Sequence, residues 1–276
     1  MTDGGELADR FRRLHRPHVP LLVANPWDAG TAKLFASLGF SALATTSAGH
    51  AFSLGRADYH VTRDEALAHA AAIVSSVSVP VTADLENGFR HDAAGVAETV
   101  SGARAAGLAG CSIEDHTGNP EGPIYSAAHA VERIAAAAEA AHSGPTALVL
   151  TARAENHLHG RADLEDTIER LVAFAAAGAD VVYAPGVTSA KDIAAIVGAV
   201  SVPVNVLMLP GGPTVSELAD LGVGRVSVGS AFALVASDAA ATAAKEFLID
   251  GTARFWDNAA RGMAVSARAL SSARDR

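Results

Sequence analysis

Short apolar runs alternate with longer helical segments along most of this chain. The apolar runs have the length of buried strands and are bounded by Gly, Pro or polar residues. They cover residues 20–24, 42–45, the start of 79–90, 110–113, 147–151, 181–184, 204–208 and 225–228. Helical patterns are expected at residues 7–14, 29–38, 94–106, 127–141, 164–177, 190–197 and 215–221, with one more after a cap at Thr62. Strands that alternate with helices in this way predict an α/β fold with a parallel sheet.

Glycines at four expected helix ends support this count. Gly39, Gly107, Gly178 and Gly222 each follow Ala or Leu and precede a short apolar run, as a left-handed glycine after a helix should. We therefore predict one (β/α)8 TIM barrel domain over residues 1–276, with a C-terminal helical segment at about 232–276. A doubly wound sheet is the alternative, but no GxGxxG follows the first strand, so dinucleotide binding is not supported.

Composition and charge narrow the class of partner. Half of the 276 residues are hydrophobic, and the formal net charge of −9 argues against a nucleic-acid or membrane-surface binder. Cys111 is the only cysteine, so no internal disulfide can form. The charged N-terminus lacks a signal-peptide pattern, and no apolar run reaches the roughly 20 residues that span a bilayer. We expect a soluble cytoplasmic protein with a small-molecule partner.

Two carboxylates follow the third expected strand. Asp84 and Glu86 stand at positions i and i+2 near its end, and Gly88 then breaks the pattern. Side chains of a strand repeat with period two, so both carboxylates should face one small volume. Their repulsion there requires a cation or a shared proton. This favours Mg2+ or Mn2+, which bind carboxylates and water. The alternative is that both are solvated loop residues.

The ends of neighbouring strands are also polar, and a barrel of this kind places its site there. The candidates are Asn25, Asp28, residues 45–47, Glu114, His116, Arg153, Glu155 and Asn205. Arg153 indicates an anionic substrate, because a guanidinium group holds carboxylate or phosphoryl oxygens bidentately. The alternative is that Arg153 pairs with Glu155 or Glu114. His116, His157 and His159 are interpreted as polar loop residues rather than a zinc site, and Cys111 as a buried hydrophobe.

Two long Gly-containing connections are candidate binding elements. Residues 46–60 form a polar connection between the second strand and the next helix. Residues 116–126 (HTGNPEGPIYS) form a second one, and loops of this kind often act as lids in enzymes. We therefore interpret the first connection as a candidate binding element and the second as a candidate lid.

Five motifs in order make the chain similar to the isocitrate lyase/phosphoenolpyruvate mutase superfamily. They are TTSAG at 45–49, LGRAD ending at Asp58, ADLENG at 83–88, SIED at 112–115 and TARAE at 151–155. The resemblance implies a (β/α)8 barrel whose last helix is exchanged between subunits of a homodimer or homotetramer. It also implies Mg2+ held by an acidic cluster, with a 2-oxo acid or its enolate bound to that metal.

The resemblance assigns roles to several positions of this chain. It places metal ligands at Asp84, Glu86 and Glu114, and an acid near metal-bound water or substrate at Asp58. Arg153 matches a substrate-binding arginine. Thr46, Ser47 and Ala48 match the segment that holds the substrate carboxylate, and we add Asn205 as a substrate-binding candidate.

The lid departs from the pattern of the better-known members. Isocitrate and methylisocitrate lyases carry a cysteine in a KKCGH-type lid, whereas residues 116–126 contain neither Lys nor Cys. Phosphonate-forming mutases carry Lys and Asn there, and this lid has Asn119 without a lysine. His116 and Tyr125 are therefore the candidate general acids on the lid.

We expect a Mg2+-dependent carbon–carbon lyase or decarboxylase that acts on a small 2-oxo or 2-hydroxy dicarboxylate through an enolate. Two alternatives stay open. One is phosphonate chemistry, either a phosphoenolpyruvate or carboxyphosphonoenolpyruvate type of mutase or a phosphonopyruvate hydrolase. The other is a binding protein for 2-oxo acids without catalytic activity.

Overall fold

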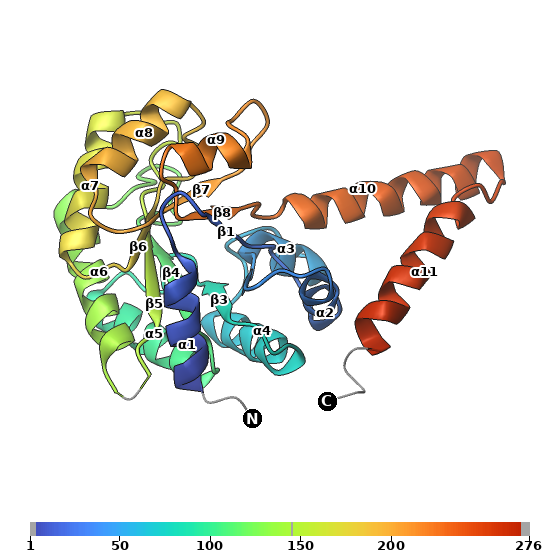
Figure 1. Ribbon diagram of the computed structural model, residues 1–276, viewed down its shortest axis with the longest axis horizontal. Helices are drawn as coiled ribbons and strands as arrows, with labels where there is room; N and C mark the ends of the chain where they lie inside the picture. The colour runs from blue at the N-terminus through green and yellow to red at the C-terminus, as the bar shows by residue number, and fades with distance from the viewer. Residues whose placement is uncertain (1–3, 145, 272–276) are drawn as a thin grey trace.

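Eight parallel strands form one curled sheet at the centre of the molecule. A computed structural model describes residues 4–144 and 146–271 (Figure 1). The order of the strands is β1-β8-β7-β6-β5-β4-β3-β2. Their bounds are Leu21–Leu22 (β1), Leu43–Ala44 (β2), Val81–Asp84 (β3), Gly110–Glu114 (β4), Val149–Arg153 (β5), Val181–Tyr183 (β6), Val204–Leu207 (β7) and Arg225–Ser227 (β8). The predicted α/β architecture with eight parallel strands is confirmed.

The two end strands of this order meet at a seam. A parallel bridge pairs Ala24 with Leu43, and the Ala44 amide donates to the carbonyl of Ala24 at 3.0 Å. The Asn25 side chain also crosses the seam, because its amide donates to the Thr45 carbonyl at 3.1 Å and its oxygen accepts from Val228 N–H at 3.2 Å. The sheet therefore curls in the manner of a TIM barrel, and Asn25 has a structural part in that curl.

Helices follow the strands at the expected places. Their bounds are Gly4–Leu14 (α1), Ala29–Ser37 (α2), Ser47–Ser53 (α3), Arg63–Ser76 (α4), Ala93–Ala105 (α5), Ala127–His142 (α6), Leu164–Ala176 (α7), Ala190–Ala199 (α8), Val215–Asp220 (α9), Ala231–Lys245 (α10) and Trp256–Ser271 (α11). Thr62 caps α4 as predicted, in a capping box with Glu65. Gly39, Gly107 and Gly178 have φ values of 100°, 79° and 104°, so these helix ends are left-handed, as the sequence indicated.

Two local predictions differ from the structure. Residues 46–60 were expected to be a connection without a helix, but Thr46 accepts a hydrogen bond from Gly49 N–H and starts α3. The fifth strand was expected to end at residue 151, but it continues to Arg153. Both differences lengthen regular structure at the C-terminal ends of the strands. The candidate site residues near α3 and at the end of β5 therefore lie on regular backbone.

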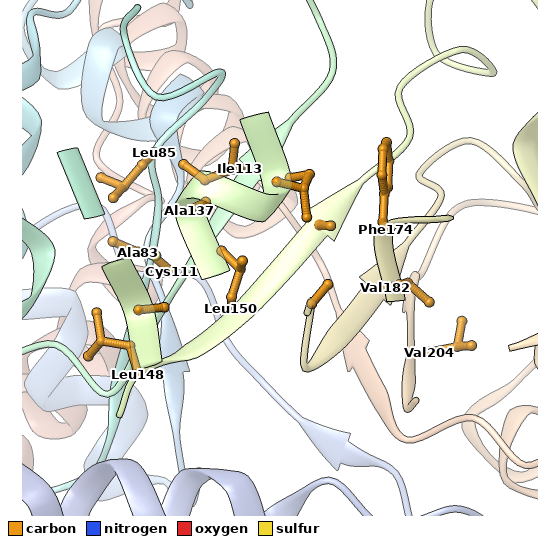
Figure 2. Close-up of a cluster of buried hydrophobic side chains, with 14 of the residues drawn as sticks. Ala83, Leu85, Cys111, Ile113, Ala137, Leu148, Leu150, Phe174, Val182 and Val204 are labelled. Atoms are coloured by element: carbon orange, nitrogen blue, oxygen red, sulfur yellow. The ribbon is translucent and has the colours of Figure 1, made fainter. Parts of the chain in front are cut away.

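Outward-facing side chains of the strands pack against the surrounding helices. Figure 2 shows Leu150 of β5 and Cys111 of β4 near Ala137 of α6. Cys111 is fully buried, as predicted, and burial raises the pKa of its thiol to about 12. Because neighbouring residues alternate in direction, Thr151 and Arg153 point to the other face of the sheet. The interior of the curled sheet is therefore polar towards the C-terminal ends of its strands.

Helix α1 covers the opposite, N-terminal end. Its Ala8 and Phe11 are buried against Leu21, Val149 and Val181. These apolar side chains close the floor of the curled sheet, so the polar interior opens towards the strand ends that carry the candidate site.

The C-terminal segment leaves the rest of the molecule and then returns. Helix α10 points outward, and α11 comes back beside α2 (Figure 1). A π-helical turn, Glu246–Asp250, and Gly251 at φ 63° join them. Large apolar side chains on this arm are exposed, including Leu234, Val235, Phe247, Leu248, Ile249, Trp256 and Met263. Within the part of the chain that the structure describes, no helix has the length and apolar character to cross a bilayer.

Candidate active site

A cavity of about 180 Å³ lies at the C-terminal ends of the strands. It contains the residues that the sequence singled out for substrate binding, together with two of the acids, and they come from four of the eight strands and the connections that follow them. These residues are Thr46, Ser47, Ala48, Asp58, Asp84, Arg153 and Asn205. The volume suits a molecule of a few carbon atoms, so the cavity agrees with the expectation of a small substrate.

Arg153 lies at the centre of the acidic residues. Its Nη1 donates to Asp84 Oδ1 at 2.8 Å, its Nε donates to Glu155 Oε1 at 2.7 Å, and its Nη2 is 3.1 Å from Glu114 Oε2. Burial opposes the charged form, but Glu155, Glu114 and Asp84 raise the pKa of Arg153 well above its usual range. Arg153 thus forms ion pairs with Glu155 and Glu114, as the alternative interpretation expected, and it forms a third ion pair with Asp84.

Asp84 and Glu86 are close for a reason other than the one expected. Strand β3 ends at Asp84, and Glu86 has a left-handed φ of 49°. The prediction that both side chains point the same way through strand alternation is therefore wrong. Instead, a turn places both beside a very small cavity that His50 and His69 also line. Burial and the nearby Asp84 and Asp58 charges raise the pKa of Glu86 to about 8.

Asp58 joins the same electrostatic cluster from the loop after α3. Burial and the Asp84 charge raise its pKa, while a hydrogen bond from the Ser47 hydroxyl opposes this shift. The Ser47 amide is 3.4 Å from Asp84 Oδ2 and donates to it. The start of α3 is thus tied to β3, and Ser47 stands between two of the carboxylates.

Tyr59 is a site residue that the sequence analysis missed. Its hydroxyl donates to Glu114 Oε1 at 2.8 Å, and its ring lies 4.7 Å from that of His116. It has a left-handed φ of 62°, and it lines a separate pocket together with Glu86. Burial raises the pKa of Glu114 well above its usual range, although Arg153 opposes this shift. In the sequence, the position of Tyr59 directly after the candidate acid Asp58 was the signal that could have identified it as a site residue.

The two lid residues proposed as general acids lie outside the cavity lining. His116 Nδ1 is 3.7 Å from Glu114 Oε1, and its ring stacks on His159 at 3.9 Å. Burial and His159 lower the pKa of His116 to about 4. The Tyr125 hydroxyl is 2.5 Å from His91 Nδ1, and Arg133 lies over its ring. His116 borders the acids, whereas the Tyr125 side chain contacts His91 and Arg133, which do not line the cavity.

The acidic residues have the chemistry of a Mg2+ site but are arranged around Arg153. Among the described residues, no group of three or more His, Cys, Asp or Glu side chains has the geometry of a metal site. However, the Glu86 carboxylate has no hydrogen-bond partner within residues 4–144 and 146–271 and lies beside Asp84. Buried carboxylates held above their usual pKa are stabilised by a hard cation. The donor set therefore fits Mg2+.

A family model described as phosphoenolpyruvate phosphomutase matches residues 11–248 of this chain. The oxaloacetate decarboxylase of Paraburkholderia xenovorans is 33% identical over 234 residues, which cover 80% of this chain and 75% of that protein. The 2-methylisocitrate lyase of Escherichia coli is 30% identical over 202 residues, which cover 70% of this chain and 67% of that protein.

Solved structures of similar proteins agree with the match to this family. A Burkholderia cenocepacia protein to which a lyase or mutase activity is provisionally attributed has 54% identity and a TM-score of 0.88, with 91% of both chains covered. An oxaloacetate acetylhydrolase in complex with its product oxalate has 26% identity and a TM-score of 0.81, with 90% of this chain and 88% of that chain covered. A phosphonopyruvate hydrolase bound to oxalate and Mg2+ has the same fold, at 24% identity and a TM-score of 0.81, covering 95% of this chain and 99% of that chain.

Proposed function

This chain belongs to the phosphoenolpyruvate phosphomutase family, within the superfamily that also contains isocitrate lyase, and from this premise we propose that it is a Mg2+-dependent carbon–carbon lyase or decarboxylase. Its substrate would be a small 2-oxo or 2-hydroxy dicarboxylate, and the reaction would pass through an enolate. Two relatives have names that refer to oxaloacetate, a substrate of this class. The family consists of lyases, mutases and hydrolases, so an enzyme is expected.

One observation carries the proposal. The Asp84 charge helps to raise the pKa values of three neighbouring acids, Asp58, Glu86 and Glu114, and Asp58 and Asp84 line the cavity together with Arg153. With all four carboxyl groups ionised, such a cluster would hold more negative charge than one guanidinium group compensates. It supports a site that takes up a divalent cation together with an anionic substrate.

Each residue would have a separate task in this reaction. Asp84 would hold the metal directly, and Glu86, Glu114 and Asp58 would hold its water ligands. Bound here, Mg2+ would supply positive charge that stabilises the enolate as its negative charge develops. Arg153 and the segment Thr46, Ser47 and Ala48 would orient the substrate carboxylate through charge-assisted hydrogen bonds. Asn205 would complete the substrate site.

Proton transfer is assigned to the lid side of the cluster. His116 is the nearer of the two lid candidates, since its Nδ1 is 3.7 Å from Glu114 Oε1 and has no hydrogen-bond partner in the described residues. With a pKa of about 4, His116 is neutral at pH 7. It would therefore accept a proton more readily than donate one, and Tyr125 would reach the cavity only if the lid moves.

Two other functions compete with this one. Phosphonate chemistry is disfavoured because the lid, residues 116–126, has no lysine. A binding protein for 2-oxo acids without activity would keep the acidic cluster and Arg153 but lack a working acid or base. A lyase, a phosphonate enzyme and a binding protein differ in the products that they form, so an assay of the products separates them.

Incubation with Mg2+ and a panel of 2-oxo, 2-hydroxy and phosphonate acids, followed by NMR, tests the proposal. We expect release of pyruvate, CO2 or a cleavage product that EDTA suppresses. Release of phosphate or formation of a phosphonate would favour the mutase or hydrolase alternative. Thermal stabilisation by oxalate and Mg2+ without any product would favour the binding protein.

The C-terminal arm supports a proposal about assembly. Phe247, Leu248 and Ile249 are 69%, 83% and 74% exposed, which is unusual for large apolar side chains. We propose that α10 and α11 are exchanged between subunits in a homodimer or homotetramer. Analytical ultracentrifugation should find an oligomer for the full chain and a smaller species for the double variant F247E/L248E. A monomer at micromolar concentration would contradict this.

A further inference from the structure

Arg225 is a buried arginine on β8 that lines the same cavity as Arg153. The side chain is at the deep end of the cavity, because its partners belong to the interior of the sheet and to α1. Its Nε donates to Asn205 Oδ1 at 2.8 Å, and its Nη2 donates to Thr151 Oγ1 at 3.0 Å. Its Nη1 is 3.2 Å from His15 Nε2. The residue is 5% exposed.

The histidine contact is a hydrogen bond to a neutral ring. His15 Nδ1 is 2.9 Å from the carbonyl of Phe11, so this nitrogen must carry the proton. The other nitrogen then has a free lone pair and accepts from Arg225. Burial and the Arg225 charge lower the pKa of His15 to about 3, which agrees with a neutral ring at pH 7. All three partners of Arg225 are therefore uncharged.

Other buried arginines of this protein have carboxylate partners or lie away from the cavity. Arg153 contacts three carboxylates, and Arg170 contacts Asp115 and Asp166. Arg133 donates to backbone carbonyls behind the lid and does not line the cavity. Within the described residues, Arg225 alone combines burial, a cavity-facing position and the lack of a carboxylate partner.

This arrangement leaves the guanidinium group with unused capacity. A guanidinium group has five N–H donors, and the described residues accept from three of them. A buried charge without a counter-charge is costly, and an anion that reaches it would offset the cost. Burial lowers the pKa of Arg225 to about 10, so it remains a cation at neutral pH.

The register of the sheet places the two cavity arginines in one row. Arg153 pairs with Tyr183, Tyr183 with Asn205, and Asn205 with Arg225 across β5 to β8. Side chains in such a row point to the same face of a sheet, and all four line the cavity. A ligand with an anionic group at each end could therefore contact both cations.

We propose that Arg225 binds the second carboxylate of the substrate and thereby selects dicarboxylates over monocarboxylates. This inference rests on the proposed function for the first carboxylate, which the metal, Arg153 and residues 46–48 would hold. Asn205 is then a positioning residue: its oxygen accepts from Arg225, and its amide donates to Ser227 Oγ at 3.0 Å, which fixes the orientation of both groups.

A matched pair of ligands tests the proposal. Malate and 2-hydroxybutyrate have the same chain length and the same hydroxy acid end, but only malate has a second carboxylate. Their dissociation constants are measured by calorimetry with Mg2+. We expect the wild type to bind malate at least about 10-fold more tightly, since charge-assisted bidentate hydrogen bonds are the strong ones. Arg225→Gln should abolish this preference by weakening malate about 10-fold to 100-fold and 2-hydroxybutyrate by less than about threefold.

Two controls separate selectivity from folding. Arg225→Lys keeps the charge and should keep part of the preference. Phe11→Leu makes a similar loss of packing below His15, outside the cavity, and should lower the melting temperature without changing the preference. Equal weakening of both ligands by Arg225→Gln would show a structural role and overturn the proposal.

Binding of oxalate with Mg2+ distinguishes a wrong assignment of Arg225 from a wrong proposed function. Oxalate lacks the chain needed to reach Arg225 from the metal, so Arg225→Gln should leave its binding unchanged. Lack of oxalate binding by the wild type would overturn the proposed function as well. If Arg225→Gln does not fold, a wild-type crystal structure with malate and Mg2+ decides the question. A distal carboxylate directed away from Arg225 would overturn the inference.

Discussion

Two buried arginines face one cavity from the same row of the sheet, yet their surroundings are opposite. Arg153 lies among Asp84, Glu114 and Glu155, whereas Arg225 contacts the neutral groups of Asn205, Thr151 and His15. The outer part of the cavity therefore has more acidic groups than cations, and the deep part has an uncompensated positive charge. A cation is stabilised in the first region and an anion in the second.

The same residue type therefore has a different electrostatic role according to the charges around it. The Arg153 guanidinium group holds three carboxylates of the protein in place. Around Arg225, no described carboxylate competes for the guanidinium group. Substitutions can alter the two regions separately.

Removal of the carboxylate at the centre of the acidic region should have the largest effect. Asp84→Ala should lower Mg2+-dependent turnover by about 10³-fold or more, because a loss of about 4 kcal/mol in transition-state stabilisation corresponds to that factor. The rate is measured on the substrate that the NMR panel identifies. Asp28→Ala is the control: Asp28 caps α2 and lies outside the cavity lining. Wild-type rates in D84A would contradict the assignment.

Replacement of the cation in the acidic region should have the next largest effect. Arg153→Gln should lower kcat/KM by about 100-fold, as expected for loss of one preorganised donor to developing charge. It also leaves Glu114 and Glu155 buried without their cation, so the melting temperature should fall. Mg2+ should restore part of that stability, which differential scanning calorimetry would detect. No change in kcat/KM would limit Arg153 to a structural role.

The residue missed by the sequence analysis should have a smaller effect. Tyr59→Phe removes the hydrogen bond to Glu114 but keeps the ring beside His116. We expect a decrease of about 10-fold in kcat, since a hydrogen bond to a charged group is worth about 1.5–3 kcal/mol. Tyr59→Leu should lower both kcat and stability, because the ring contact is lost too. An unchanged kcat in Y59F would show that Glu114 does not need this bond.

The neutral His15 ring beside Arg225 should make the stability of the protein depend on pH. His15 has a pKa of about 3 in the folded state and an ordinary value of 6.5. Between these values the unfolded chain binds the proton and the folded chain does not, so stability falls as the pH decreases from 6.5 towards 3. His15→Gln should remove this dependence, which amounts to up to a few kcal/mol over the whole pH range, in denaturant titrations. A slope identical to that of the wild type would show that His15 is not the responsible group.

Much of the fold follows from local patterns. The alternation of apolar runs with helices and the glycines at helix ends identify the strands, because these features depend on short stretches of chain. They also place Asp84, Glu114 and Arg153 at strand ends, which is why the outer region could be recognised. The five motifs led to the family for the same reason.

Other features depend on backbone turns outside the strands or on contacts between distant residues. Glu86 lies beside Asp84 through a left-handed turn, and Tyr59 reaches Glu114 from a loop 55 positions earlier in the chain. Residues 46–60 contain α3, although their sequence favours an irregular connection. None of these could be obtained from periodicity, because period two ends where the strand ends.

Arg225 is the clearest example of the division. The sequence by itself determined that it begins a short apolar strand, since neighbouring residues set that pattern. The tertiary structure alone decided that its guanidinium group is buried beside His15, Thr151 and Asn205, because those residues are up to 210 positions away along the chain. Charge compensation is a sum over all neighbours in space, and a linear sequence does not contain that sum.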